Sequence, residues 1–441
     1  MKIEADSDVQ APLLPEILQS ATENSNASIL GAVFNVSTTI IGAGIMSIPA
    51  TFKILGVIPA FVSMTIVAFL VDISVEFMLR FTHSGHSTTY AGLMRESFGW
   101  PGSIAVQVSV MITNLGCLII YLIIIGDVLC GNQPDGITHF GVLQEWFGVH
   151  WWNARDFVLF LVVVFIMLPL VMVRRVESLK FSSAVSIFLA LVFVAICFAM
   201  AISAIFAGKT ETPRLVPHLD GQASFFNLFT AIPVIVTAFT FHFNVHPIGA
   251  EFPKQDQMRC AVRISLVLCA SIYIAVGIFG YLLFGDSIMS DLLMNFDQSS
   301  DSAFGSLMND AVRLSYALHL VLVFPLLNFS LRANIDEFLF PNQPPLATDN
   351  SRFLPISFIL LSISYLLAIT IPDIWYFFQF MGSTAAVCQA FIFPSAIVLR
   401  DVHGISSRRD KTIATLMTVL ALVTSTIAIV TNICNLFGTK S

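Results

Sequence analysis

Charged residues are scarce in this sequence. Only 11% of its 441 residues are Asp, Glu, Lys or Arg, whereas 56% are hydrophobic. Soluble globular domains carry about 25% charged residues, so this composition excludes a soluble protein and indicates one that crosses a membrane many times. The formal net charge of −7 lies largely in the tail and loops, so nucleic acid is not expected as a partner.

Motifs of catalysis and metal binding are also missing. The seven cysteines form no CxxC pair and most fall inside apolar runs, so we interpret them as packing residues. Neither HExxH nor GxSxG occurs, and no enzyme activity, cofactor or metal site is predicted. No basic stretch precedes a short apolar run with a cleavage site, so no cleavable signal peptide is expected.

Long apolar segments fill most of the chain. Residues 1–27 are polar and acidic and are predicted to be a disordered cytoplasmic tail. Residues 28–441 are predicted to form one transmembrane domain of an all-α polytopic protein, because a span needs about 20 apolar residues. We expect eleven spans, at Ile29–Leu55, Val57–Arg80, Ser103–Cys130, Asp156–Val173, Phe181–Ala207, Phe225–Gly249, Ala261–Phe284, Val312–Arg332, Leu354–Ile371, Ile374–Leu399 and Thr412–Asn435.

The distribution of basic residues in the loops predicts the orientation. With eleven spans and a cytoplasmic N-terminus, fifteen of the 21 Lys and Arg residues face the cytoplasm. Cytoplasmic loops are enriched in Lys and Arg, so an N-terminus inside the cell is favoured. Asp72, Glu76 and Arg80 share one face near the cytoplasmic end of the second span, which predicts a stripe of ion pairs there.

The first span contains a signal for a broken helix. Gly42, Gly44 and Pro49 occur within eight residues, in the middle of an apolar segment. Glycine and proline disfavour a continuous helix, and a break at bilayer depth is tolerated only where the freed N–H and C=O groups line an enclosed cavity. Broken helices in corresponding positions of two halves indicate the binding site of a secondary transporter.

A second, weaker break is expected in the sixth span. Polar His242, Asn244 and His246 lie close to Pro247 in an otherwise apolar run. If the first five spans form one repeat, the sixth begins the next one from the opposite side, because five is odd. We therefore predict inverted repeats at about 29–207 and 225–399, with an extra helix at about 412–435.

At these residues the chain resembles a known family. Phe34-Asn35-Val36-Ser37 followed by Ile41-Gly42-Ala43-Gly44-Ile45 is similar to the first helix of the amino acid/auxin permease superfamily. The likeness is strongest to the sodium-coupled neutral amino acid transporters and their plant vacuolar relatives, and Val245-His246-Pro247 followed by Glu251 resembles their sixth helix. The resemblance implies a LeuT-like fold of eleven helices, arranged as five plus five inverted and one extra, and transport of amino acids.

Backbone at the first break is the leading candidate for substrate binding. Gly42, Ala43 and Gly44 would offer N–H groups to a carboxylate, and Ile45 would begin the second half-helix. The alternative is a close packing contact between helices. Thr38 and Thr39 could bind a cation or the amino group, or their hydroxyls could bond to their own helix.

The second break and the third span supply further candidates. Phe241, His242 and Asn244 would face the substrate from the second break, and His242 could instead be a neutral histidine held by a freed carbonyl. Asn114 and Tyr121 lie seven residues apart on one face of the third span, where they could line the cavity or bond within the bundle.

Ion coupling departs from the resemblance. In the family, sodium is held by a polar side chain at the position of Thr38 and by a threonine of the eighth helix. The corresponding stretch here, Leu320–Phe324, has no hydroxyl, and sodium prefers oxygen ligands. This departure argues against sodium and leaves proton coupling, with Thr38 and His242 as candidates, or facilitated flux.

The predicted function is secondary active transport of free amino acids, neutral or acidic, by alternating access across a lipid membrane. The membrane is expected to be vacuolar, endoplasmic reticulum or plasma membrane. The alternative is an amino acid sensor that binds without net transport, but a tail of about 28 residues with no evident docking motif argues for transport.

Overall fold

The computed structural model describes most of the chain. The described residues are 29–132, 139–174, 180–210, 212–219, 222–249, 255–297, 303–340, 343–344, 346–371 and 373–438, so the predicted tail lies outside them, as does Glu251. Within these ranges the secondary structure is helical, apart from one isolated bridge between Asn132 and His139. The prediction of an all-α protein is confirmed.

Nine helices of the described part are long and apolar enough to cross a membrane, and a bent helix pair makes up to ten. The pair is α2 (Ile29–Ile40) and α3 (Gly44–Leu55). The others are formed by α4 (Val57–Ser84), α5 (Tyr90–Cys130), α9 (Lys180–Phe206), α10 (Gln222–Phe239) with α11 (Val245–Gly249), α12 (Gln255–Phe284), α13 (Ala303–Leu339), α14 (Asn350–Thr370), α15 (Ile374–Met381) with α16 (Phe393–Arg400), and α17 (Arg408–Gly438).

The eleventh expected span is not confirmed. It is the fourth, Asp156–Val173, where the structure has the shorter run of α7 (Arg155–Leu161), the π-helical η3 (Val162–Met167) and α8 (Leu168–Val171). The separate turn η2 (Trp151–Asn153) precedes α7, so α7 cannot extend toward the N-terminus. Beyond Val171 the helix ends before Arg174, which leaves a run that is short for a membrane crossing.

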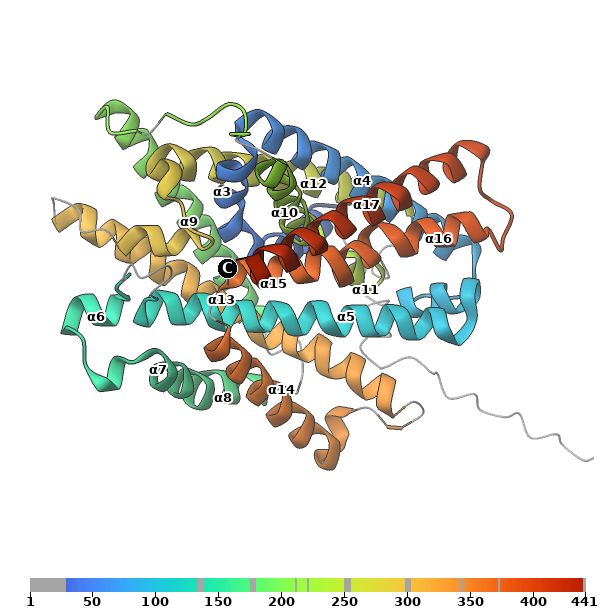
Figure 1. The fold of residues 1–441 in the computed structure, drawn as a ribbon. Coiled ribbons are helices and arrows are strands. Elements are labelled where there is room, and N and C mark those ends of the chain that lie inside the picture. The colour runs from blue at the N-terminus through green and yellow to red at the C-terminus, as the bar shows by residue number, and fades with distance from the viewer. Residues whose placement is uncertain are drawn as a thin grey trace, which may run out of the picture.

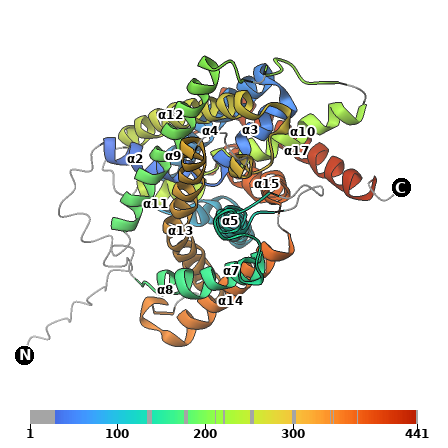
Figure 2. The same cartoon turned by 90° about the vertical axis from the view of Figure 1, so that its left-hand side faces the viewer.

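Helix α5 runs along the length of the bundle (Figure 1). Helices α7, α8 and α14 lie on one side of it, and α3, α4, α10 and α12 lie on the other, as the view along α5 also shows (Figure 2). Helix α13 contacts both α5 and α9. We call the face where α2 begins and α4 ends the N-side, and the opposite face, where α3 and α5 end, the far side.

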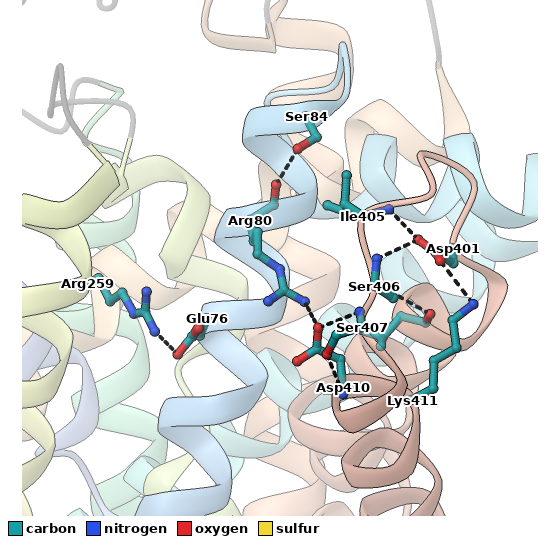
Figure 3. A network of polar contacts seen from close by, with 11 residues as sticks. Glu76, Arg80, Ser84, Arg259, Asp401, Ile405, Ser406, Ser407, Asp410 and Lys411 are labelled. Atoms are coloured by element: carbon teal, nitrogen blue, oxygen red, sulfur yellow. Dashed lines mark hydrogen bonds and ion pairs between the residues drawn. The ribbon is translucent and has the colours of Figure 1, made fainter.

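Ion pairs join α4 to its neighbours at the N-side (Figure 3). Arg80 pairs with Asp410 of α17 at 2.8 Å, and Glu76 pairs with Arg259 of α12. Arg263 of α12 contacts Asp72 at 3.1 Å. The stripe expected on α4 is therefore made of ion pairs between helices, which fasten α4 to α12 and α17.

Asp401 fastens the loop between α16 and α17 (Figure 3). It is the one described non-glycine residue with positive φ, at 49°, a conformation that Asp tolerates better than most residues. Its carboxylate accepts hydrogen bonds from the N–H groups of Ile405 (2.9 Å) and Ser406 (3.1 Å) and pairs with Lys411 at 3.0 Å. Burial raises the pKa of Asp401, but the hydrogen bonds from Lys411 and Ser406 outweigh it and hold the pKa below its usual value.

Replacing Asp401 with alanine is expected to destabilise the protein by about 1–3 kcal/mol, because two backbone donors lose their acceptor and alanine is strained at positive φ. A carboxylate with a lowered pKa stabilises the fold above its unfolded pKa, and this stabilisation is lost as the pH falls through the folded pKa. The difference in thermal midpoint between D401A and the parent should therefore be full at neutral pH and shrink below about pH 4. Asp401→Asn keeps an acceptor and tolerates the backbone, so it should retain most of the stability; equal midpoints for D401A and the parent at neutral pH would contradict this account.

Candidate functional site

The first break lies where the glycines predicted it. Helix α2 ends at Ile40, α3 begins at Gly44, and their axes differ by 60°. The last residue before α3, Ala43, has no side chain that could cap the helix. The first N–H groups of a helix have no partner within it, and among the described residues those of Gly42, Ala43 and Gly44 have no hydrogen-bond acceptor. Three donors are thus free at the positive end of α3.

The second break interrupts the sixth span after Phe239, where α10 ends. Phe241 is not helical, with φ −132° and ψ 13°, and His242–Asn244 form the short turn η5. Helix α11 then continues from Val245 and contains Pro247. Both helix breaks predicted from the sequence are therefore present.

The two breaks contact each other directly. A Cβ atom placed on Gly44 would lie 2.8 Å from the Cβ of Ala238, closer than side chains approach. From α12, the Tyr273 hydroxyl lies 2.6 Å from the Ile40 carbonyl oxygen and 3.1 Å from that of Ala238, so its proton is shared between the ends of α2 and α10. The hydroxyl of Tyr316, on α13, donates to the Gly42 carbonyl at 2.7 Å.

A cavity of about 560 Å³ opens beside these contacts. It extends from the break along α2 as far as Phe34 and Asn35, which are exposed. On the far-side half of the same span, every residue from Gly44 to Phe52 is buried. None of its described lining side chains carries a charge. The lining residues are Phe34, Asn35, Thr38, Thr39, Ile40, Gly42, Ala43, Gly44, Thr113, Cys117, Tyr121, Ser186, Ile187, Thr237, Ala238, Thr240, Phe243, Asn244, Ile248, Val323, Leu326, Leu327, Phe329, Ser330 and Phe378.

Seven of the eleven residues singled out in the sequence line this cavity. The Thr38 and Thr39 hydroxyls donate to the carbonyls of Phe34 (2.7 Å) and Asn35 (2.9 Å), so each proton is used within α2 although both residues line the cavity. The seven lining residues are Thr38, Thr39, Gly42, Ala43, Gly44, Tyr121 and Asn244.

The other four lie outside the lining. Ile45 and Phe241 are fully buried, and His242 is held against α4, with its Nε2 2.7 Å from the Ser74 hydroxyl oxygen. Asn114 does not line the cavity, but its amide donates a hydrogen bond at 3.5 Å to the hydroxyl of Ser330, which does.

Tyr273, Tyr316, Thr237 and Phe378 were not found from the sequence. Thr237 lines the cavity, and its hydroxyl lies 2.9 Å from the Pro233 carbonyl of its own helix and 3.2 Å from the Phe378 carbonyl of α15. Tyrosines in apolar spans are common packing residues, so nothing in the sequence distinguished Tyr273 and Tyr316 from the other tyrosines. In the stretch compared with the sodium ligand, Val323 lines the cavity with a hydrocarbon side chain.

The fold and the cavity define a multi-pass membrane protein built on a LeuT-like scaffold. The solved structure of MhsT in complex with L-phenylalanine superposes with a TM-score of 0.58 over 92% of this chain and 98% of that chain, at 13% identity. This likeness concerns the fold alone.

The chain belongs to the transmembrane amino acid transporter protein family, whose model matches residues 25–437. It is 60% identical to the amino acid transporter AVT6C of Arabidopsis thaliana, over 97% of this chain and 98% of that protein. It is 27% identical to the sodium-coupled neutral amino acid transporter 7 of Danio rerio, over 87% of this chain and 81% of that protein. The resemblance seen in the sequence is confirmed, and these relatives are transporters rather than enzymes.

Proposed function

We propose that this protein is a secondary transporter that carries free amino acids by alternating access. The observation that supports this most is the cavity at the junction of two broken helices, beside three free N–H groups at the start of α3. The substrate carboxylate would bind the N–H groups of Gly42–Gly44, and its ammonium group would face lone pairs of Thr38, Thr39 and Asn244. The 29–207 and 225–399 segments would act as inverted repeats, with 412–435 as the extra helix.

The cavity chemistry bears on the substrate class. Because the described lining is uncharged, a cationic side chain would lose its hydration without gaining a carboxylate partner. Neutral side chains fit this lining, and an acidic side chain would enter most readily in its protonated form. If the N-side is cytoplasmic, as the basic residues predict, the cavity is open to the cytoplasm in this conformation.

Exchange of amino acids in proteoliposomes tests the proposal. We expect saturable exchange of neutral amino acids that is unchanged when sodium is replaced by potassium, because the Leu320–Phe324 stretch offers no side-chain oxygen. Exchange of acidic amino acids should rise as the pH is lowered, because more of the substrate is protonated. A strict requirement for sodium would contradict the proposed coupling.

The same preparation separates a transporter from a sensor. A sensor would bind amino acid saturably, as measured by equilibrium binding or thermal shift, without exchange or accumulation. The proposed ion-coupling role of His242 predicts that His242→Gln flattens the pH dependence of exchange. If His242 instead serves only to bond Ser74, the variant should lower stability and leave the shape of the pH profile unchanged.

A further inference from the structure

A short segment between α12 and α13 covers the far side of α3. We call residues Gly285–Asp297 the far-side cap; they include the turns η6 (Gly285–Ser287) and η7 (Leu292–Asp297). The Ser47 hydroxyl donates to the carbonyl of Ser290 at 2.7 Å, and the Lys53 ammonium donates to that of Ile288 at 3.1 Å. Ser47 lies about one helical turn beyond the cavity-lining Gly44, so the cap closes the bundle just above the cavity.

Further contacts hold the cap to other elements. The Ser290 hydroxyl donates at 3.0 Å to Asp373, which caps the N-terminus of α15. Asp286 of the cap accepts from Arg214 at 2.7 Å, and Arg214 also donates to the Lys53 carbonyl at 3.2 Å. Motion of α3 away from the cap would break the bonds that Ser47 and Lys53 donate to it, whereas Asp373 and Arg214 contact the cap from other segments.

Among the described side chains of the cap, Asp291 is a buried carboxylate with one oxygen that has no hydrogen-bond partner. Asp291 is 1% exposed, and its Oδ1 accepts a hydrogen bond from the Leu293 N–H at 2.9 Å. Its Oδ2 is shielded from solvent and has no hydrogen-bond partner among the described residues. A buried carboxylate with an unpaired oxygen is far more costly when it is ionised than when it is protonated.

The charged groups around Asp291 are already paired with others. Asp127 of α5 and Arg155 of α7 pair with each other, and both act on the charge of Asp291. Arg313 of α13 pairs with Glu145 of α6 at 2.6 Å. Asp373, which caps α15, and Lys53 of α3 contact the cap, and Asp286 belongs to it. Burial and the charge of Asp127 raise the pKa of Asp291 well above its usual value, although Arg155 and Arg313 oppose this.

We propose that Asp291 is a proton-binding site that controls the far-side cap. The carboxyl group holds a proton while the cap is closed on α3, and it releases the proton when the cap lifts and water reaches it. Asp291 is not among the described residues that line the cavity, so its proton exchanges with the far side and is not carried with the substrate. Acid on the far side therefore favours the closed cap. The proposal rests on alternating access, because it requires the far side to open.

Cysteine labelling measures the closure of the cap. Ser47 is 0% exposed beneath the cap, so Ser47→Cys reports opening to a membrane-impermeant maleimide added from the far side. Val149→Cys, in a far-side loop where Val149 is 67% exposed, supplies the reference for the pH dependence of the thiol reaction itself. Both are made in a background with Cys130→Ser and Cys434→Ser. From about pH 8 to about pH 5.5 the normalised labelling of S47C should fall by at least about tenfold.

Neutralising the proton site should remove this dependence. In Asp291→Asn the amide resembles the protonated acid, so labelling of S47C should be slow at both pH values. Asp286→Asn is the matched control, because it removes a cap carboxylate that is exposed and paired with Arg214, and it should keep the parent pH dependence. Size-exclusion profiles and thermal midpoints show whether each variant is folded, and Asp291→Glu, which keeps the titrating group, should keep a pH dependence.

Two outcomes would overturn the proposal. One is a pH dependence in D291N equal to that of the parent. The other is a parent that transports amino acids but whose S47C is never labelled, which would show that the far side does not open beneath the cap. A protein whose S47C labelling follows pH as expected but that exchanges no amino acid would contradict the proposed transport and leave the proton-controlled cap standing.

Discussion

Replacing Gly44 with alanine is expected to reduce amino acid exchange by roughly 100-fold. The new Cβ would lie 2.8 Å from the Cβ and 2.9 Å from the Cα of Ala238, and the Cα belongs to backbone that cannot rotate away. Overpacking of this kind costs about 1–3 kcal/mol, and about 2.7 kcal/mol corresponds to a factor of 100. The strain falls on the contact that holds the start of α3 against the end of α10, so it alters the geometry of the free N–H groups.

Gly42→Ala is the matched control for this variant. Its Cβ would meet only the Tyr121 hydroxyl oxygen, at 3.1 Å, which is the far end of a side chain. G42A should therefore lose far less exchange than G44A, and combining Gly44→Ala with Ala238→Gly should recover part of the loss, because one of the two clashing atoms is removed. Exchange in proteoliposomes and thermal midpoints in detergent are the measurements. Equal exchange by G44A and the parent would show that the two breaks need not pack this closely.

The breaks could be predicted because their signals are local. Gly42, Gly44 and Pro49 act on the backbone of the helix that contains them, and so does Pro247 in the sixth span. Span positions follow from apolar length in the same way. The fourth span is the exception, because its hydrophobic run is helical only from Arg155 to Val171, between a separate turn and a basic residue.

The partners of individual side chains were less predictable, because they depend on packing between distant segments. His242 has the sequence features of a proton carrier, but its Nε2 faces Ser74, which lies 168 residues away in the sequence. Asn114 and Tyr121 share a face of α5, yet only Tyr121 reaches the cavity. Helical periodicity gives the face of a helix but not the depth at which each residue meets its neighbours.

Replacing Tyr273 with phenylalanine is expected to lower exchange by roughly 30-fold. The tyrosine hydroxyl lies near the carbonyls of Ile40 and Ala238, which are 233 and 35 residues away along the chain, and it is the contact that fastens both breaks to α12. Removing it leaves two buried carbonyl oxygens without this donor, at a cost of about 2 kcal/mol, equivalent to a factor of about 30. The ring itself is fully buried, and phenylalanine preserves its packing.

A second tyrosine shows whether the effect comes from the position of the Tyr273 hydroxyl or from the loss of any tyrosine hydroxyl. Tyr365→Phe is the matched control, because it removes a hydroxyl that donates at 3.1 Å to the Asp156 carbonyl at an exposed position far from the breaks. Y365F should exchange amino acids like the parent. Y273F should also bind substrate more weakly in thermal-shift titrations, because the ends of α2 and α10 are no longer held together beside the cavity. If Y273F and Y365F have equal exchange and equal affinity, the shared proton of Tyr273 does not hold the site, and the packing of Gly44 on Ala238 and the bond from Tyr316 to Gly42 suffice to position the breaks.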